Sequence, residues 1–390
     1  MNKNKNKNKN EIRHLSLFSG CGGMDIGLNG NFDVMNKFIP KKSNKLFTRV
    51  PKTRIKTVFA NDIKNDSRKF WLKNLSHICE NFHHESIVDL VKKHKKGQSS
   101  FPSNIDIVTG GFPCQDFSIS GLRKGFESNK SDKNDRNIKN SKETRGQLYL
   151  WMKEVIEIVK PKIFIAENVK GLVDMKPVFE KIKSDFSGIK PGYEVYTREL
   201  FAPDYGIPQS RRRVIFIGIS KSFIKINKLV ITEDSIFPDA KFSKFKDLFI
   251  KNIYPKAKFF FEDLDEPELS VDLSQQSYSK AKYANGQGKS EVNMEGFAPT
   301  IRSEHHGNIE YRYLSKSRGG INLIDKNLAE RRLTVRECAR IQTFPDNLDF
   351  VYDINKKNGL SASAAYKLIG DAVPPLMAYE LFKKIEKLFN

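Results

Sequence analysis

The sequence predicts an α/β fold built on a mostly parallel sheet. Apolar runs of strand length alternate along the chain with amphipathic segments of helical length, which is the pattern of a sheet covered by helices. Three of these runs, 14–18, 57–60 and 105–108, each lead into a glycine-rich turn or a polar side chain. Parallel strands end at a common edge, where open α/β sheets place their binding sites. We therefore expect the functional residues to gather at that edge.

The chain is long enough for one large domain and a smaller one, and it is strongly basic. Its 390 residues include 68 Lys and Arg against 46 Asp and Glu, which gives a formal net charge of +22. A globular protein this basic usually meets a polyanion, and nucleic acid is the first candidate. The abundance of Lys, Asn and Ile also fits the bias of an AT-rich genome, so the charge gives only modest support to nucleic acid.

The cysteine pattern indicates neither a disulfide framework nor a metal site. Cys21, Cys79, Cys114 and Cys338 are far apart, and no CxxC pair or His/Cys cluster has zinc spacing. We expect no metal and a reducing cytoplasm. No apolar run is long enough to span a bilayer. The polar repeat that opens the sequence is expected to be disordered, not a signal peptide or an anchor.

A first strand over 14–18 leads into the glycine-rich stretch SGCGGMDIGL at 19–28. A strand, a glycine-rich turn and a helix start form a cradle for a nucleotide, with backbone N–H groups near the ligand. Gly20, Gly22 and Gly23 are too closely spaced for the GxGxxG pattern, which disfavours a dinucleotide site. A simple tight turn explains the glycines equally well.

A second strand over 57–60 follows a basic, irregular stretch, 29–56, that we expect to be a surface insertion. The strand ends before Asp62, where an acidic side chain commonly holds ribose hydroxyls. The alternative is a cap for the amphipathic helix expected over 66–81. A short third strand is expected at 87–88.

The strand over 105–108 runs into GGFPCQDFSISG, 110–121, which carries Cys114. Only a thiolate is a good nucleophile, so a reactive Cys114 needs a positive or hydrogen-bonding environment. A small buried thiol is an equally good interpretation of this stretch alone. The polar segment 122–146 is expected to be a lid over the site, with an idle insertion as the alternative.

A helix expected over 146–160 stops at Pro161, and the next strand, over 163–166, ends at Glu167. A carboxylate at this strand end faces the same edge as Cys114 and is a natural acid or hydrogen-bond partner for it. Taken singly, this glutamate is equally a solvated loop residue.

An antiparallel hairpin, with strands over 193–200 and 214–219, is expected to close the sheet. The arginines at 211–213 suggest a clamp on phosphate or on a planar polar group, with a solvated charge run as the alternative. Beyond residue 222 helices become hard to identify. The stretch 298–315 mixes basic, amide, histidine and tyrosine side chains, which suits base-edge and phosphate contacts or a polar β-domain surface. A helix is expected over 331–342, and a last one begins at about 374.

Taken together, these stretches resemble the DNA (cytosine-5) methyltransferase family, of the bacterial and phage restriction–modification type, in the family's motif order. FSGCGG is similar to the motif that holds S-adenosylmethionine, and GFPCQDFSISG carries the family's Pro-Cys dipeptide. The stretch 167–169 looks like the ENV motif, and 209–213 fits the QxRxR pattern. The stretches 331–346 and 365–375 are similar to the last motifs. The final motif usually reads GNxVPP, and here Asp371 replaces the asparagine.

The resemblance implies a Rossmann-like sheet of the S-adenosylmethionine-dependent methyltransferases, mostly parallel with one antiparallel strand. A smaller, mainly β or irregular target-recognition domain accompanies it. The implied boundaries are a disordered tail over 1–12, a catalytic domain over 13–221, a target-recognition domain over 222–345 and a return to the catalytic domain over 346–390.

The resemblance also implies the reaction, which is sequence-specific cytosine-5 methylation of double-stranded DNA. S-adenosylmethionine is the donor and S-adenosylhomocysteine the product. The target cytosine is flipped out of the duplex, the Cys114 thiolate adds to its carbon 6, and carbon 5 takes the methyl group. Glu167 would stabilise charge at ring nitrogen 3, Arg213 would hold the exocyclic oxygen, and Arg211 would position nearby groups.

The site residues that the resemblance implies fall into three groups, with no metal ligand among them. The catalytic group is Cys114, Glu167, Arg211 and Arg213. The cofactor-binding group is Phe18, Gly20, Gly22, Gly23, Asp62, Pro113, Asp371 and Val373. The DNA-contacting group is Gln115, Ser118, Ser120, Asn168, Gln209, Thr300 and Arg302.

Two other functions remain alternatives at this point. A tRNA cytosine-5 methyltransferase shares the catalytic domain but lacks a large variable region, so the long stretch between Arg213 and Arg331 favours DNA. A non-catalytic DNA-binding regulator would have lost the Pro-Cys or ENV residues, and both are intact. We expect a monomer in a bacterial or phage-encoded cytoplasmic setting, at the nucleoid and not at a membrane. A cognate restriction endonuclease would be a functional partner, not a physical one.

Overall fold

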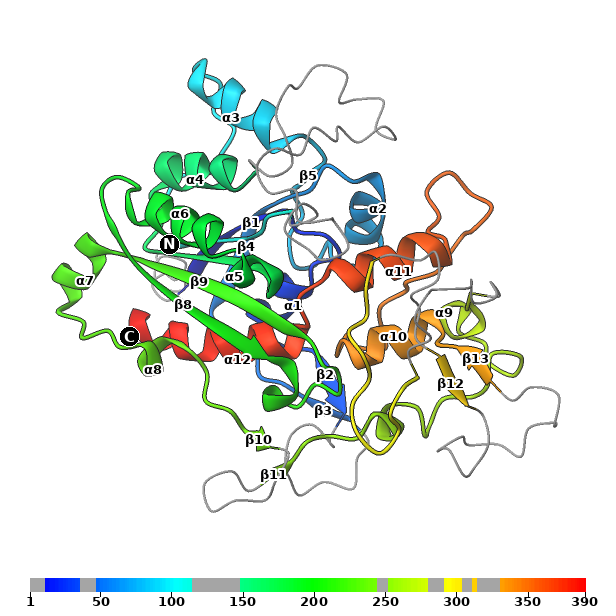
Figure 1. The fold of residues 1–390 in the computed structure, drawn as a ribbon. Helices are drawn as coiled ribbons and strands as arrows, with labels where there is room; N and C mark the ends of the chain where they lie inside the picture. Colours follow the sequence, from blue (N-terminus) through cyan, green and yellow to red (C-terminus); the bar gives the residue numbers. More distant parts are fainter. Residues whose placement is uncertain are drawn as a thin grey trace, which may run out of the picture.

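A seven-stranded sheet forms the centre of the computed structural model (Figure 1). The structure describes residues 11–35, 47–113, 148–243, 252–279, 291–303, 311–313 and 330–390. The strands run across the sheet in the order β5, β4, β1, β6, β7, β9, β8. β9 pairs antiparallel with both β7 and β8, whereas the other neighbouring pairs are parallel. The expected α/β fold with one antiparallel strand is confirmed.

The sheet strands agree with most of the expected runs and extend them by a few residues. They are β1 (Ile12–Leu17), β4 (Ile55–Asn61), β5 (Phe82–His83), β6 (Ile107–Gly111), β7 (Ile163–Val169), β8 (Tyr193–Phe201) and β9 (Arg212–Ser220). The hairpin expected from the sequence is the β8–β9 pair.

Each face of the sheet carries its own hydrophobic core, because successive side chains of a strand point to opposite faces. In β7, Ile163 and Ile165 pack on one face, and Phe164 and Ala166 pack on the other. Helices lie on both sides of the sheet in Figure 1. The first face is covered by α1 (Gly23–Asn29) and α12 (Pro375–Ile385), and the second by α3 (Ile87–Lys95), α4 (Leu148–Val159) and α6 (Lys176–Ser187).

The remaining elements lie at the ends of the sheet and beyond it. The helices are α2 (Asn65–Asn74), α5 (Gly171–Asp174), α7 (Lys221–Asn227), α8 (Glu233–Ile236), α9 (Leu273–Gln276), α10 (Val335–Ile341) and α11 (Ala362–Asp371). Short strand pairs are formed by β2 (Asp33–Met35) with β3 (Phe47–Arg49), β10 (Phe242–Ser243) with β11 (Asn252–Ile253), and β12 (Tyr311–Tyr313) with β13 (Glu330–Arg332).

Three expectations about local structure are wrong. The pair at 87–88 begins helix α3, because Ile87, Val88, Leu90 and Val91 form the buried stripe of a helix; the edge strand is β5. The helix expected over 331–342 begins only at Val335, since the preceding residues pair as β13. The stretch 29–56 is no simple surface insertion. Its described part is the β2–β3 pair, and Val34, Met35 and Val50 enter the core.

Two glycines of α1 allow this helix to pack closely on the end of the chain. A Cβ atom on Gly23 would lie 2.2 Å from the carbonyl oxygen of Val373, and one on Gly27 would lie 2.3 Å from that of Pro375. Neither distance is tolerable for a side chain. Glycine at these positions therefore serves the contact between α1 and the segment that leads into α12.

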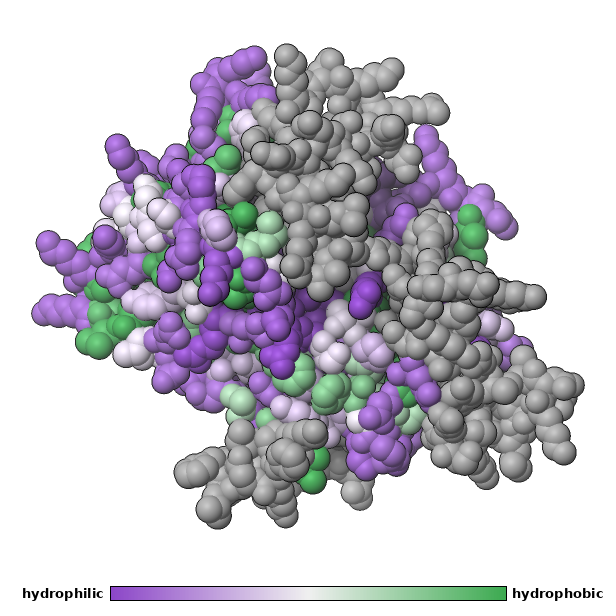
Figure 2. All heavy atoms as spheres, viewed as in Figure 1, coloured by the Kyte–Doolittle hydropathy of each residue, from purple (hydrophilic) through white to green (hydrophobic). Residues whose placement is uncertain are grey.

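Polar side chains dominate the described part of the face that Figure 2 shows. In the view of Figure 2 hydrophilic residues predominate and apolar residues form only small groups. Among the described residues, no helix is both long and apolar enough to cross a membrane.

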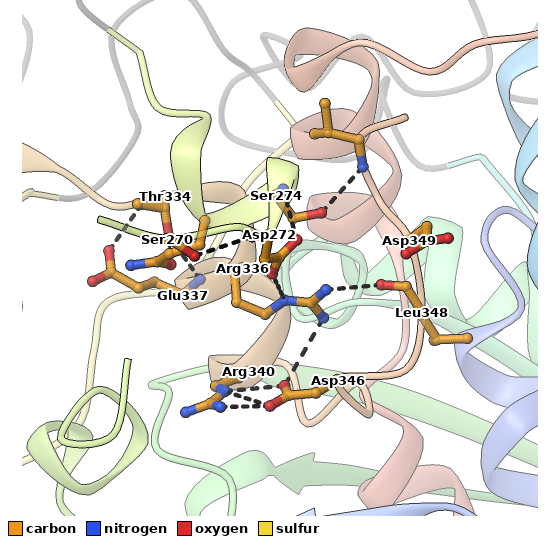
Figure 3. A network of polar contacts seen from close by, with 12 residues as sticks. Ser270, Asp272, Ser274, Thr334, Arg336, Glu337, Arg340, Asp346, Leu348 and Asp349 are labelled. Carbon is orange, nitrogen blue, oxygen red and sulfur yellow. Dashed lines mark hydrogen bonds and ion pairs between the residues drawn. The ribbon is translucent and has the colours of Figure 1, made fainter. Parts of the chain in front are cut away.

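Three buried arginines connect β13 and α10 to the segment that precedes them, and Figure 3 shows two of the three, Arg336 and Arg340. Arg336 binds Asp272 through Nε at 2.6 Å and donates from Nη2 to the carbonyl of Leu348 at 3.0 Å. Arg340 binds both Asp263 and Asp346, at 2.6 and 2.5 Å. These pairs hold an acidic stretch, 263–272, against a helix that is distant from it in sequence.

The third arginine of this network, Arg331, pairs with two glutamates. Arg331 binds Glu337 at 2.8 Å and Glu266 at 3.0 Å, and Glu337 has no exposed side-chain surface. Glu337 also accepts the backbone N–H of Thr334, whose hydroxyl in turn accepts the N–H of Glu337. One carboxylate therefore neutralises an arginine and caps α10 at the same time.

We predict that Glu337→Gln destabilises the protein by about 3–5 kcal/mol, because it leaves the Arg331 guanidinium buried without its main counter-charge. The free energy of unfolding in urea measures this directly. Glu295→Gln is the matched control, since Glu295 pairs with two lysines but is largely exposed, and it should leave the urea midpoint unchanged. A midpoint for Glu337→Gln equal to that of the wild type would contradict the assignment.

Candidate active site

Four neighbouring strands of the sheet end at one edge and deliver the predicted site residues there. β4, β1, β6 and β7 are adjacent and parallel, so the residues that follow them lie side by side. Phe18 follows β1, Asp62 follows β4, Pro113 follows β6, and Glu167 lies near the end of β7. Cys114 comes directly after Pro113 in the chain. Four expected site residues fall outside the described residues, namely Cys114, Gln115, Ser118 and Ser120.

The loop after β1 borders open space at one glycine, Gly20. Phe18 and Gly20 have φ values of 53° and 54°, so the backbone here is left-handed. A Cβ atom on Gly20 would meet no atom within 4 Å. Its N–H donates to Asp62 at 2.9 Å, and its carbonyl accepts from the indole of Trp71 at 3.1 Å. The backbone of Gly20 therefore borders open space, while its N–H and its carbonyl are both held by hydrogen bonds.

The other two predicted glycines have a packing role in this structure. A Cβ atom on Gly22 would lie 2.4 Å from Leu75, and Gly23 backs onto Val373 as described above. Of the three glycines expected to contact a cofactor, only Gly20 borders open space.

Asp62 is nearly buried and acts as an anchor for two loops. Its Oδ2 accepts the N–H of Gly20, and its Oδ1 accepts the N–H of Lys64 at 2.8 Å. Each carboxylate oxygen keeps a further lone pair. Asp62 can therefore fix the glycine loop and still accept from a ligand hydroxyl.

Glu167 and Arg213 form a buried ion pair at the end of β7. The Glu167 carboxylate lies 2.7 Å from Nε of Arg213, and both side chains are about nine-tenths buried. Burial raises the pKa of Glu167, and the guanidinium groups of Arg213 and Arg211 oppose this without reversing it. Gly111 makes room for the pair, because a Cβ atom there would lie 3.0 Å from Glu167 Oε2. The site thus holds a carboxyl group whose pKa is raised by burial, beside a fixed cation.

Asn168 fixes the backbone that leads to Cys114. Its side-chain amide donates to the carbonyl of Phe112 at 3.1 Å, and its Oδ1 accepts the N–H of Val169. Only 2% of Asn168 is exposed. The expected DNA contact is therefore not available to this side chain in this structure, and its contacts join the ends of β6 and β7.

Gln209 and Arg211 are both fully buried. Gln209 accepts the N–H of Ile301 at 2.9 Å and donates to Gln342 at 3.1 Å. Arg211 donates to the carbonyls of Ile301, Gly370 and Ala372 at 2.6–2.9 Å. Sequence reasoning expected a DNA contact for Gln209 and a role near the substrate for Arg211. The structure places both inside the protein, where they join the β8–β9 turn to residue 301 and to α11.

The other predicted residues lie around this buried connection. Thr300 donates its hydroxyl to the carbonyl of Ser210 at 2.6 Å, and the neighbouring Arg302 is exposed. The carboxylate of Asp371 binds Lys64 at 2.8 Å. Burial alone would raise the pKa of Asp371, but Lys64, Ser303 and Arg211 outweigh burial and hold the pKa below its usual value. Asp371 is therefore ionised at neutral pH.

Two of the cysteines that the structure describes are poor nucleophiles. Cys21 is buried and donates to the carbonyl of Leu368 at 3.3 Å, and its burial raises the thiol pKa. Burial also raises the pKa of Cys79, to about 11. Within the described residues no group of three or more His, Cys, Asp or Glu side chains could hold a metal ion.

Comparisons with known proteins agree on one family. A family model described as C-5 cytosine-specific DNA methylase matches residues 12–387. The Type II methyltransferase M.NgoPII of Neisseria gonorrhoeae is 28% identical over 393 residues, which cover 96% of this chain and 95% of the relative. The Type II methyltransferase M.BsuRI of Bacillus subtilis is 29% identical over 384 residues, which cover 94% and 78%.

Solved structures share the same fold. The Entamoeba histolytica methyltransferase EhMeth superposes with a TM-score of 0.58 at 17% identity, covering 96% of this chain and 98% of that chain. The S. pombe Dnmt2 methyltransferase gives a TM-score of 0.54 at 17% identity, covering 96% and 98%.

A buried polar cluster beneath the glycine loop was missed by sequence reasoning. Asp25, in the first turn of α1, accepts the hydroxyl of Ser16 at 3.0 Å and is 1% exposed. His14, at the centre of β1, contacts the hydroxyls of Thr57 and Thr109 with its two ring nitrogens. The available signal was the pair of polar residues in the otherwise apolar strand HLSLF.

Burial raises the pKa of Asp25 from 3.8 to about 7, and it lowers that of His14 to about 3. Between about pH 4 and pH 7 folded Asp25 therefore retains a proton that the unfolded chain has lost, and its contribution to stability falls as the pH rises. We predict that Asp25→Asn, which keeps the Ser16 contact, gains stability relative to the wild type on going from about pH 5 to about pH 8.

Paired thermal melts of the two proteins across this pH range measure the difference. The His14 titration is common to both proteins and cancels in the comparison. A difference in melting temperature that stays constant with pH, or shrinks as the pH rises, would exclude a raised Asp25 pKa.

Proposed function

The chain belongs to the C-5 cytosine-specific DNA methylase family, and on that premise we propose how this DNA cytosine-5 methyltransferase uses its residues. The observation that carries the proposal is the buried Glu167–Arg213 pair, which lies beside the strand that leads to Cys114. A carboxyl group and a guanidinium side by side match the ring nitrogen 3 and the adjoining exocyclic oxygen of a cytosine. Cys114 is the nucleophile in this proposal.

The covalent chemistry begins at a base taken out of the duplex. The Cys114 thiolate forms a bond to carbon 6, and the electron pair of the carbon 5–carbon 6 double bond makes carbon 5 nucleophilic. S-adenosylmethionine, when bound, supplies a methyl group on a sulfonium for carbon 5 to take. Loss of the carbon 5 proton and of the thiolate from carbon 6 restores the aromatic ring.

Glu167 and Arg213 lower the barrier to thiolate addition by meeting the charge that develops on the ring. A protonated Glu167 would donate to ring nitrogen 3, and burial, which raises the pKa of this carboxyl group, favours the protonated form. Arg213 holds the exocyclic oxygen and fixes the orientation of Glu167. Arg211 acts as a positioning residue, because its donors are directed at three backbone carbonyls.

The residues around Gly20 fit the methyl donor. Gly20 borders open space, and the Asp62 carboxylate at its side is suited to ribose hydroxyls. Phe18, Pro113 and Val373 would line the donor site, with Gly22 and Gly23 shaping the loop. No metal is required by this chemistry.

We assign domains by the same reasoning. The sheet strands run from Ile12 to Ser220, so 13–221 holds all of the sheet except Ile12 and would form the catalytic domain. The segment 346–390 would return to it, because α12 packs on α1. The intervening segment, 222–345, would recognise the DNA sequence. Thr300 and Arg302 of this segment would lie near the substrate. Gln115, Ser118 and Ser120 would contact the flipped base or the gap that it leaves.

The biological setting follows from the relatives, which are named Type II methyltransferases. The protein would act in the cytoplasm, as a monomer on double-stranded DNA, and would protect host sites from a cognate endonuclease or act as an orphan enzyme. Lys and Arg displace condensed counterions from DNA, so binding should weaken with salt.

We predict that Cys114→Ala abolishes methyl transfer to duplex DNA and preserves DNA binding, since the nucleophile is lost and the surface is unchanged. Mass spectrometry of 5-methylcytosine and a gel-shift assay measure the two properties. Duplex DNA carrying 5-fluorocytosine should trap a covalent complex in the wild type only. Methylation by the alanine variant would refute the mechanism, and methylation of tRNA in preference to duplex DNA would refute the substrate.

We predict that Glu167→Gln lowers kcat about 10²-fold, the scale expected when one donor to a developing charge is lost. Wild-type kcat should also fall as the pH rises and Glu167 loses its proton, whereas the glutamine variant should lack this dependence. The pH profile distinguishes a proton donor from a purely structural residue. An identical profile in both proteins would exclude Glu167 as the donor.

A further inference from the structure

The end of α11 is a meeting point of chain segments that are distant in sequence. It receives the Cys21 thiol at Leu368, the Gln342 amide at Ile369, and the Arg211 guanidinium at Gly370 and Ala372. A Cβ atom on Gly370 would lie 2.3 Å from the backbone of residues 302–303, so that segment rests directly on α11. These contacts hold the position of Asp371.

Asp371 binds a side chain of the loop between β4 and α2. Its carboxylate lies 2.8 Å from the ammonium of Lys64, which is 307 positions away in the sequence. The ammonium is half exposed and the carboxylate somewhat less so. The same carboxylate accepts a hydrogen bond from Ser303 and is attracted by Arg211.

Lys64 connects this pair to the donor site. Its backbone N–H donates to Asp62 Oδ1, and Asp62 Oδ2 accepts the N–H of Gly20. A displacement of residue 64 therefore acts on Asp62 and on the glycine that borders open space. The pair therefore joins the β4–α2 loop, which Asp62 ties to Gly20, to the end of α11.

We propose that Lys64 and Asp371 form an ionic latch that holds the β4–α2 loop in its donor-binding position and so sets the affinity for S-adenosylmethionine. This rests on the proposed placement of the donor at Gly20 and Asp62. An asparagine at position 371 would carry no charge and could not neutralise Lys64. The aspartate at position 371 and the lysine at position 64 therefore act as a pair.

The energetic scale of the latch is modest. Half-exposed ion pairs contribute up to about 1 kcal/mol, which corresponds to a factor of about five in a dissociation constant. Salt weakens such pairs, because the screening length falls from about 10 Å at 0.1 M to about 3 Å at 1 M. The latch therefore makes donor affinity depend on ionic strength.

A double-mutant cycle on the full-length protein tests the latch. Asp371→Asn, Lys64→Gln and the double variant are titrated with S-adenosylmethionine by calorimetry. We expect each single variant to raise Kd about threefold to fivefold and the double variant to raise it no further, since both changes break one interaction. Raising the salt from about 0.05 M to about 0.5 M should weaken binding to the wild type and change Kd less in the variants.

Lys356→Gln is the matched control. Lys356 is exposed and pairs with Asp353 at 3.0 Å, away from the latch. It should leave Kd and its salt dependence unchanged. Hydrogen exchange gives a readout independent of binding, because the amides of Gly20 and Lys64 should exchange faster in the two latch variants and not in the control.

The latch would be overturned if the single variants bound S-adenosylmethionine with the wild-type Kd. It would also be overturned if the increase in Kd of the double variant equalled the product of the two single increases. Unchanged amide exchange would overturn it as well. If the wild type itself fails to bind S-adenosylmethionine, the proposed donor site fails, and the latch with it. If the wild type binds S-adenosylmethionine and the latch variants bind it with the same Kd, only the latch is overturned and the donor site stands.

Discussion

The buried guanidinium of Arg211 is the interaction on which the arrangement of the site depends. It donates to the backbone carbonyls of Ile301, Gly370 and Ala372, and so joins the β8–β9 turn to residue 301 and to the end of α11. A charge in the protein interior is costly unless several acceptors meet it. Because these acceptors come from residue 301 and from the end of α11, both segments must stay beside Arg211 for the guanidinium to keep its hydrogen bonds.

The sheet supplies the second constraint. Its parallel strands end at one edge and bring the glycine loop, Asp62, Glu167 and the backbone before Cys114 together there. This placement follows from the strand order and does not depend on contacts between the side chains. Short hydrogen bonds then fix each group, such as that from Asn168 to the carbonyl of Phe112. The result is a carboxyl group with a raised pKa beside a cation, which is chemistry suited to a ring that becomes charged during reaction.

The sequence was a good guide to whatever depends on local pattern. Apolar runs predicted the sheet strands, and the motif order predicted the family, because both depend on consecutive residues.

The sequence was a poor guide to which polar side chains are buried. Gln209 and Asn168 look like surface polar residues, yet both lie inside, because their partners, such as Ile301 and Phe112, are 92 and 56 positions away. Ile87 and Val88 fit a strand as well as a helix, and only the buried stripe through Val91 decides for the helix. The Asp25 cluster also needed three strands to be assembled before it became visible.

This chain belongs to a family of enzymes that methylate carbon 5 of cytosine, and we infer that it does so at a defined DNA sequence. Bisulfite sequencing of DNA from cells that lack other cytosine methylation, with and without expression of the protein, tests it most directly. We expect unconverted cytosines at one position of one short sequence, in the expressing cells only. Complete conversion in the expressing cells, or unconverted cytosines without a common sequence, would contradict it.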